Sequence, residues 1–266
     1  MNARPRWDRP TLKQYAKTAL KNFYWKAVLA SLIFSILGGG LGASSGRGTG
    51  TKTIINGDGL NLDHNLFNHD SLLFSSIAIG IFIIIFLLAF ALGLVYGIFV
   101  AGPMEVGHNR FYLESRSNPT GIGRLFYAFS CGNYGNVVKT MFLRNLYIFL
   151  WSLLFVIPGI VKSYQYRMVP YILAENPNIS ADRAFELSKQ MMDGRKWDLF
   201  IFDWSFFGWE LLAGILIIGG IFLKPYIQAA NAEVYLWLRY DALYTGYADS
   251  RELNGLFMDP PEYTQY

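Results

Sequence analysis

Carboxylates inside apolar stretches are the residues of this sequence that could do chemistry. Asp203 and Glu210 lie seven residues apart, a spacing that places both on one face of a helix. Glu233 lies in the next apolar stretch. Two carboxylates at close range cannot both ionise cheaply, so an approach of Glu210 to Glu233 would favour a shared proton or cation. With the neighbouring amides, the candidate intramembrane polar cluster comprises Asp203, Glu210, Gln228, Asn231 and Glu233.

The same acids have a structural alternative. A charge at the centre of a bilayer costs from about 2.5 kcal/mol upward, so such a group faces the interior of a helical bundle and finds a partner. The cluster could be a hydrogen-bond network joining two antiparallel helices, with Asp203 paired to Arg144, Arg195 or Lys196. A proton- or cation-coupled pathway and a structural network are both compatible with the sequence.

Other kinds of site find no support in the sequence. Cys131 is the single cysteine, which excludes an intramolecular disulfide and a cysteine-based metal cluster. No grouping of nucleophile, base and orienting residue can be identified, and no nucleic-acid-binding module is evident. We therefore expect no catalytic residues, no cofactor, no metal site and no nucleic-acid partner.

Long apolar runs must position the candidate residues. Hydrophobic residues make up 53% of the 266 residues and charged residues 16%, whereas a soluble domain carries about 25% charged residues. Residues 71–104 carry no charge, and a membrane-spanning helix needs about 20 predominantly apolar residues. A soluble core helix has no reason to be apolar on every side over such a length. The sequence therefore predicts an all-α, polytopic transmembrane helical bundle.

About six apolar stretches define the expected membrane segments. They lie at residues 27–41, 75–102, 143–161, 162–175, 199–223 and 225–243. We expect a single membrane domain over residues 27–244, with cytoplasmic segments at 1–26 and 245–266. The fourth stretch has two cations in 14 residues, which leaves open whether it spans, is re-entrant or continues the third helix past a kink.

Glycine–proline pairs mark two of the expected helix ends. Proline has no backbone N–H with which to continue a helix, and its ring clashes with the preceding turn. We therefore expect the second segment to end at Gly102-Pro103 and the third to break at Pro158-Gly159.

The distribution of positive charge gives this layout an orientation. Of the 23 Lys and Arg residues, 18 lie in the four pieces that are expected to be cytoplasmic, residues 1–26, 105–144, 174–198 and 239–266. Cytoplasmic loops of membrane proteins carry an excess of Lys and Arg. We therefore expect a multi-pass protein with both termini on the cytoplasmic side.

An amphipathic helix is predicted at residues 11–24, before the first membrane segment. Its apolar residues recur at intervals of three or four, and a stripe of like charges is formed by Lys13, Lys17 and Lys21. Anionic lipid headgroups would relieve the repulsion within this stripe, with about 1 kcal/mol from each lysine near the surface. The three lysines are candidate headgroup contacts. A solvated basic tail is the alternative.

A second amphipathic helix is predicted at residues 180–193, on the cytoplasmic side. Ser180 suits the N-cap position, and Gly194 suits the residue after the last turn. The helix could dock an unidentified protein partner through its polar face, with candidate contacts Arg183, Glu186, Lys189 and Gln190. The alternative is a helix that packs onto the ends of the membrane segments.

Several stretches of the second half resemble a known family. They are VIPGIVKSYQYRMVPYILAENPNIS from residue 156, SKQMMDGRKWDLF from residue 188 and SFFGWELL from residue 205. In this order they resemble the bacterial membrane-protein family called domain of unknown function 975. NFYWKAVLASLI, from residue 22, fits the usual beginning of that family. The family is similar, more distantly, to the membrane domain of some glycerophosphodiester phosphodiesterases, whose activity is not carried over because no phosphodiesterase domain follows.

The resemblance implies an all-helical protein of the bacterial cytoplasmic membrane, without an established activity. Together with the residues, it favours a non-enzymatic accessory, scaffold or envelope-homeostasis protein, whose partners are the lipid bilayer and an unidentified protein. A small proton- or cation-coupled transporter or channel is one alternative. A protein that binds a lipid or a lipophilic peptide is another.

Overall fold

The computed structural model describes residues 9–37, 69–117, 120–215 and 219–253 of the chain. No strand occurs in these ranges, which confirms the all-helical fold. The helices are α1 (Arg9–Lys21), α2 (Tyr24–Leu37), α3 (His69–Tyr96), η2 (Gly97–Ala101), α4 (Gly102–Ser117), η3 (Ile122–Phe126), α5 (Tyr127–Ser130), α6 (Tyr134–Leu154), α7 (Val156–Gln165), α8 (Val169–Glu175), α9 (Ala181–Met191), α10 (Lys196–Ile215) and α11 (Gly219–Tyr244).

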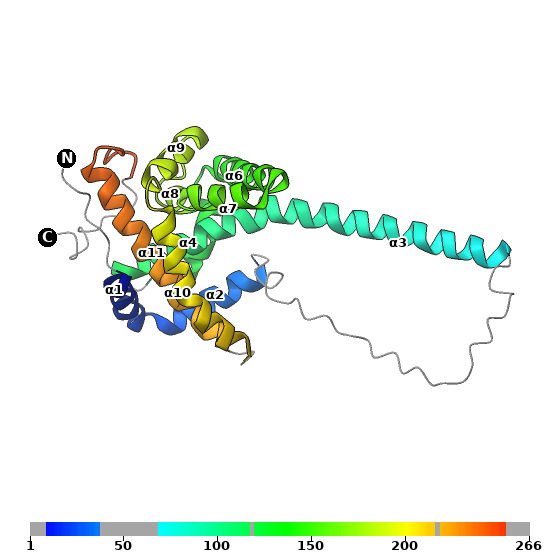
Figure 1. The fold of residues 1–266 in the computed structure, drawn as a ribbon, viewed down its shortest axis with the longest axis horizontal. Helices are drawn as coiled ribbons and strands as arrows, with labels where there is room; N and C mark the ends of the chain where they lie inside the picture. The colour runs from blue at the N-terminus through cyan, green and yellow to red at the C-terminus, as the bar shows by residue number, and fades with distance from the viewer. Residues whose placement is uncertain (1–8, 38–68, 118–119, 216–218, 254–266) are drawn as a thin grey trace.

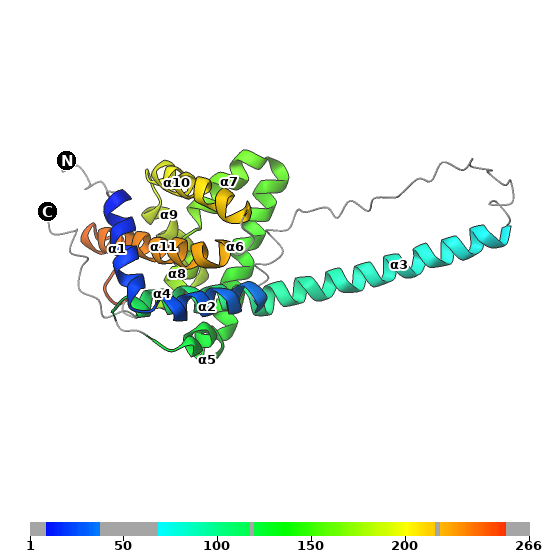
Figure 2. The same ribbon diagram turned by 90° about the horizontal axis from the view of Figure 1, so that it is seen from below.

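Helix α11 lies at the centre of a helical body (Figures 1 and 2). Helices α1, α2, α4, α9 and α10 all pack against it. Its second half is buried without interruption from Ala232 to Leu238, and Tyr235 is one of the largest side chains of the body with no exposure. Phe111 of α4 and Phe202 of α10 are buried to the same extent. A single core therefore joins helices that are far apart in the sequence.

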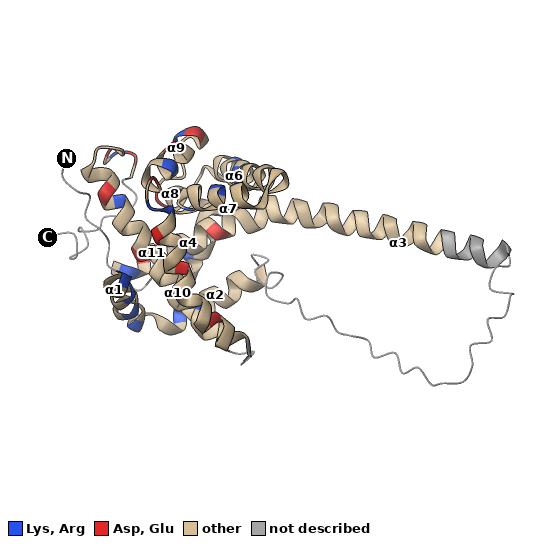
Figure 3. Cartoon of the chain, viewed as in Figure 1, with Lys and Arg blue, Asp and Glu red and all other residues tan. Residues whose placement is uncertain are grey.

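Helix α3 projects away from this body (Figure 1). None of its side chains from Ile77 to Tyr96 is buried, although the most apolar 18-residue window of the stretch has a mean hydropathy of 3.1. No Lys, Arg, Asp or Glu occurs in α3 from Ile77 to Tyr96 (Figure 3). A helix that is apolar on every side and leaves its side chains unburied requires an apolar surrounding, which a bilayer supplies.

The helix that begins with α3 does not end at Gly102-Pro103, so that prediction is wrong. It continues through η2, a short π-helical stretch, and α4 to Ser117. Pro103 cannot donate to the carbonyl one turn earlier, that of Phe99. The hydroxyl of Tyr134 donates to the Phe99 carbonyl at 2.5 Å, and the wider π-turn accommodates the changed register.

The third predicted segment breaks at Phe155, three residues before the predicted Pro158-Gly159 break. Phe155 has extended backbone angles, which end α6 at Leu154 and start α7 at Val156. Pro158 lies in the first turn of α7, where its missing N–H is not needed. The two helices pack on one another as a hairpin (Figure 2). A Cβ at Gly159 would lie 2.7 Å from the Cα of Ser152, so glycine permits this close packing.

The predicted segment at 162–175 is not one helix. Its beginning belongs to α7, and its end forms α8, which is separated from α7 by a turn. All seven residues of α8 are buried within the protein, where they contact α4, α6 and α9. The physical reason is local: Pro170 starts a new helix, and the apolar residues after it are covered by protein.

The N-terminal amphipathic helix is present as α1, and it meets α2 at a bend of 98°. Its apolar face, with Leu12, Ala16 and Leu20, is buried in the core against α11. The apolar residues of α1, which recur at intervals of three or four, therefore form a face that packs on protein.

Two helical stretches are long and apolar enough to cross a membrane, Ile77–Ser117 and Tyr134–Leu154. The bent pair of α1 and α2 is a third candidate if the two helices form one span. The described residues thus contain two or three candidate spans, which indicates membrane association. They do not show the six segments that the hydropathy pattern predicts.

Candidate functional site

Asp203 of α10 is held by a network from two neighbouring helical segments. Arg167 donates to both carboxylate oxygens, at 2.5 and 2.9 Å, and the Tyr164 hydroxyl donates to Oδ2 at 2.8 Å. Arg167 also donates to Oδ1 of Asn231, on α11, at 2.9 Å. A bidentate guanidinium–carboxylate pair is among the strongest hydrogen-bonded pairs. Two members of the predicted cluster, Asp203 and Asn231, are therefore joined through an arginine.

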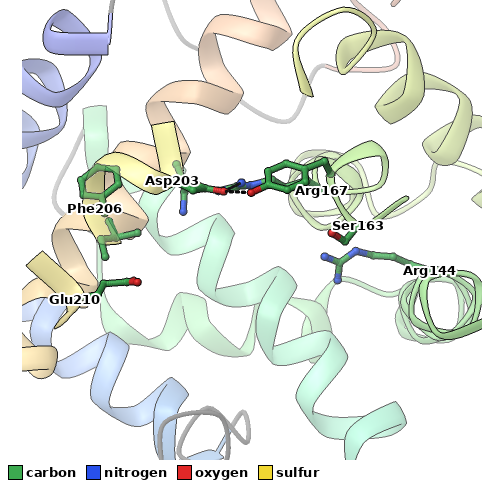
Figure 4. Close-up of a pocket in the computed structure, with 9 residues that line it drawn as sticks. Arg144, Ser163, Arg167, Asp203, Phe206 and Glu210 are labelled. Atoms are coloured by element: carbon green, nitrogen blue, oxygen red, sulfur yellow. Dashed lines mark hydrogen bonds and ion pairs between the residues drawn. The ribbon is translucent and has the colours of Figure 1, made fainter. Parts of the chain in front are cut away.

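An open pocket of about 460 Å³ lies beside this network, between α6, α7, α10 and α11 (Figure 4). It is lined by Arg144, Ser163, Tyr164, Arg167, Asp203, Phe206, Glu210, Ile227 and Asn231. Glu210 points into the pocket from α10 and Arg144 from α6 on the opposite side (Figure 4). Asp203 and Glu210 thus share one face of α10, as their spacing of seven residues predicts. Gln228 is half-buried on α11 and is not a lining residue.

Glu233 belongs to a different contact. Its side chain is 3% exposed and accepts from the Nε atom of Arg116, on α4, at 2.7 Å. Asn231 lines the pocket, and a residue two positions further along a helix points to another side. The hypothesis that Glu210 and Glu233 share a proton or cation therefore has no support in the packing, since Glu233 has an arginine as its counter-ion.

Asp203 pairs with none of its predicted partners Arg144, Arg195 and Lys196, and each of the two arginines has another carboxylate. Arg144 donates through Nη1 to the oxygens of Glu105, at 3.2 and 3.3 Å. Arg195 pairs with Asp241 at 3.0 Å. Arg167, which lies in the fourth predicted segment, is the partner of Asp203 instead.

The most deeply buried ion pair was not predicted from the sequence. Glu175 of α8 has no side-chain exposure, and both of its oxygens accept from the Nε atom of Arg239, at 2.9 and 3.0 Å. The Tyr235 hydroxyl donates to Glu175 at 2.7 Å. Tyr235 and Arg239 lie four residues apart on α11, so one helix face supplies both donors. That i, i+4 pattern is visible in the sequence, but nothing in it identifies Glu175 as the acceptor.

Helix α9 is the best-defined predicted element. Its N-cap is Ser180, whose hydroxyl accepts from the backbone N–H of Arg183 at 3.3 Å, as predicted. Gly194, with φ of 70°, adopts the left-handed conformation that glycine favours beyond a helix end. The buried face of α9 contacts α6, α8 and α11.

The polar face of α9 is partly covered by the chain itself. Arg183 donates to both carboxylate oxygens of Glu252, at 2.8 and 3.0 Å, and to one oxygen of Glu186. The guanidinium of Arg183 lowers the pKa of the Glu252 carboxyl. The two carboxylates in turn raise the pKa of Arg183, against the opposing effect of its burial. Of the four candidate docking residues, Glu186 and Lys189 are exposed, whereas Arg183 and Gln190 are half-buried.

The three lysines of α1 differ in their surroundings. Lys13 donates to the hydroxyl of Ser205 at 2.6 Å and lies 4.2 Å from the ring centre of Phe206, both on α10. Lys17 and Lys21 are exposed. The proposed headgroup contact is therefore restricted to these two side chains on geometric grounds, because Lys13 turns toward protein.

No group of three or more His, Cys, Asp or Glu side chains in the described ranges could hold a metal ion. The charged groups of the pocket can pair with ions or hydrogen-bond a polar molecule. No nucleophile with an adjacent base is found among the pocket residues.

Comparison with known proteins gives one result. A model of the family described as "Protein of unknown function (DUF975)" matches residues 71–241. No curated protein and no solved structure matches the chain, so the distant similarity to glycerophosphodiester phosphodiesterase membrane domains is not supported. The matched range includes every residue of the pocket and the helices α4 to α10.

Proposed function

The chain belongs to the DUF975 family of proteins of unknown function, and from that premise we propose that it is a non-enzymatic accessory or scaffold protein of the cytoplasmic membrane. In this proposal α3 anchors the chain in the bilayer, and the helical body presents α9 to a protein partner. The single observation that carries the proposal is the exposed, uncharged surface of α3.

The anchoring role follows from the length of the apolar run. Residues 77–101 form 25 consecutive helical residues, which extend about 37 Å at 1.5 Å per residue. The hydrocarbon core of a bilayer is about 30 Å thick. Large apolar side chains such as Phe82 and Ile84, 68% and 66% exposed, have no other described side chains to cover them. Lipid would cover them fully.

The paired acids support a scaffold over a transporter. Asp203 and Glu233 each have a guanidinium partner at hydrogen-bonding distance. An acid that already has a counter-ion is a poor carrier for a proton or cation, because releasing the arginine would leave a buried charge uncompensated.

The topology of the proposed protein has both termini on the cytoplasmic side. The distribution of Lys and Arg supports this orientation, and the six-segment layout stays a prediction. Beyond α3 and α6, apolar side chains are exposed near the ends of other helices, including Leu37 of α2, Ile157 of α7 and Leu212 of α10. These ends are further candidates for contact with lipid.

One observation favours a second function, proton- or cation-coupled transport. Glu210 is exposed in the pocket and forms no hydrogen bond or ion pair with a described residue. A carboxylate at such a position could bind a cation transiently during transport.

Membrane anchoring and transport can be tested on the full-length chain. We expect the protein to stay in the membrane pellet after extraction with alkaline carbonate, because α3 is held by lipid; release into the supernatant would contradict the proposal. Purified protein in proteoliposomes should give the same proton and cation flux as empty vesicles. The matched control is Asp193→Asn, a change at an exposed acid outside the pocket. A flux that is lost in Glu210→Gln and kept in Asp193→Asn would establish the transporter instead.

The docking role of α9 has its own test. A photo-crosslinking residue at Lys189 should give one defined adduct in intact membranes, and the same residue at Lys139, an exposed position on α6, should not. An identical adduct pattern at both positions would exclude α9 as the docking surface.

A further inference from the structure

The pocket between α6, α7, α10 and α11 has the size of a site for a small molecule. Its volume is about 460 Å³, and ligand pockets span about 300–1,000 Å³. Its lining combines charged residues with the apolar side chains Phe206 and Ile227. A molecule that occupies it must therefore offer charge on some of its surface and apolar groups on another part.

The two opposing walls carry opposite charges (Figure 4). Arg144 uses Nη1 for Glu105 and Nε for the Tyr166 carbonyl, and its Nη2 donates to no other described residue. Glu210, on the other wall, has no described hydrogen-bond or ion-pair partner. Between these walls, Arg167 and Asp203 neutralise one another. The pocket thus offers a guanidinium that can bind an anion on one side and a carboxylate that can bind a cation on the other.

The helices α10 and α7, which line the pocket, also carry exposed apolar side chains. Trp209, Leu211 and Leu212, the neighbours of Glu210 on α10, are 64%, 58% and 54% exposed. On α7, Ile160 and Val161 are exposed as well. At the proposed membrane location a carboxylate is costly without a cation, so the pocket favours an occupant that brings its own positive group together with apolar chains.

We propose that this pocket binds the headgroup of a zwitterionic phospholipid that carries a primary ammonium. The ammonium lies at Glu210, the phosphate lies at Arg144, and the acyl chains leave along the apolar surface of α7 and α10. A primary ammonium has three N–H donors for the carboxylate, whereas a quaternary ammonium has none. The inference rests on the proposed membrane location, but not on the scaffold role.

The test uses the full-length protein, exchanged into vesicles that contain equal amounts of phosphatidylethanolamine, phosphatidylcholine and phosphatidylglycerol. The protein is then extracted in mild detergent, and the retained lipids are quantified by native mass spectrometry. We expect phosphatidylethanolamine to be retained over the other two lipids. Glu210→Gln should weaken that preference at least about tenfold, because the neutral amide removes the charge-assisted hydrogen bond to the ammonium. Asp193→Asn, the matched control, should leave it unchanged.

Three results would overturn the proposal. Equal retention of the ethanolamine and choline lipids would remove the requirement for a primary ammonium, and preferred retention of phosphatidylglycerol would indicate a purely anionic ligand. A Glu210→Gln protein with unaltered preference would place the lipid elsewhere. The comparison of lipids on the unaltered chain does not depend on how well the variant folds. A protein that resists carbonate extraction but shows no lipid preference fails only this inference, so the membrane anchor is judged separately.

Discussion

The buried ion pair between Glu175 and Arg239 offers the sharpest test of the packing described above. Glu175 has no side-chain exposure, and Arg239 has 13%. Replacing Glu175 by alanine would leave the guanidinium and the Tyr235 hydroxyl without their shared acceptor inside the core. Breaking a buried pair by removing one partner destabilises a protein by about 3–5 kcal/mol.

This free energy can be expressed as a melting temperature. For domains of 150–250 residues, about 1 kcal/mol corresponds to roughly 2–4 °C, so Glu175→Ala should lower the midpoint by about 6–20 °C. The assay is thermal unfolding of the purified chain in mild detergent, followed by intrinsic tryptophan fluorescence. Asp193→Ala removes an exposed acid and should shift the midpoint by less than about 2 °C, because surface changes of this kind have small effects.

A double variant separates the loss of the pair from the loss of volume. Glu175→Leu with Arg239→Met replaces both charges by apolar groups of similar size, which is often neutral for stability. We expect the double variant to recover most of the stability that Glu175→Ala loses. A Glu175→Ala protein that melts within about 2 °C of the parent would refute the placement of the pair. So would a double variant that is no more stable than the single one.

Three further predictions concern contacts between and beyond the helices. Gly159→Ala should destabilise the α6–α7 hairpin by about 1–3 kcal/mol, measured by the same melting assay, because the added Cβ would overlap α6. Tyr134→Phe should cost about 0.5–1.5 kcal/mol, because the Phe99 carbonyl loses a donor at the π-turn, and hydrogen exchange should rise there. Glu252 has a lowered pKa in the folded chain, so its pairing with Arg183 stabilises above about pH 4.3 and is lost as the pH falls through the folded pKa. Because the pair is partly exposed, this loss is below about 1 kcal/mol and should appear as faster proteolysis of residues 245–253 at low pH.

Matched variants make these predictions specific. Gly208→Ala adds a Cβ with no atom within 4 Å and should not destabilise the chain. Tyr147→Phe removes another hydroxyl from α6 and should leave exchange at the π-turn unchanged. Equal effects of Gly159→Ala and Gly208→Ala would contradict the close packing of α6 and α7, and proteolysis that does not change with pH would contradict the role of Glu252.

The sequence by itself determined the local features of this protein. Continuous apolar composition was sufficient to identify α3, because a long run without charge indicates a membrane-spanning helix independently of the rest of the fold. The N-cap at Ser180 was also predicted, since it depends only on residues three positions apart. The three stretches of the second half that carry the family resemblance lie in the matched range, whereas NFYWKAVLASLI, from residue 22, precedes it.

The helix ends near prolines were less predictable, because a proline can either start a helix or lie within one that continues. Pro158 and Pro170 start helices, where the missing N–H is not needed. The helix continues through Pro103, because the Phe99 carbonyl, to which proline cannot donate, accepts from the hydroxyl of Tyr134, 31 residues later in the chain.

Only the tertiary structure decided which charges meet. Asp203 and Arg167 are separated by 36 residues, and Glu233 and Arg116 by 117, so no periodic pattern relates them. Their pairing depends on how α4, α7, α10 and α11 turn their faces toward one another. A helical pattern fixes which residues share a face of a helix. The packing of the whole body decides which other helix that face contacts. A buried charge requires a partner, and this partner is the opposite charge that the fold brings within reach.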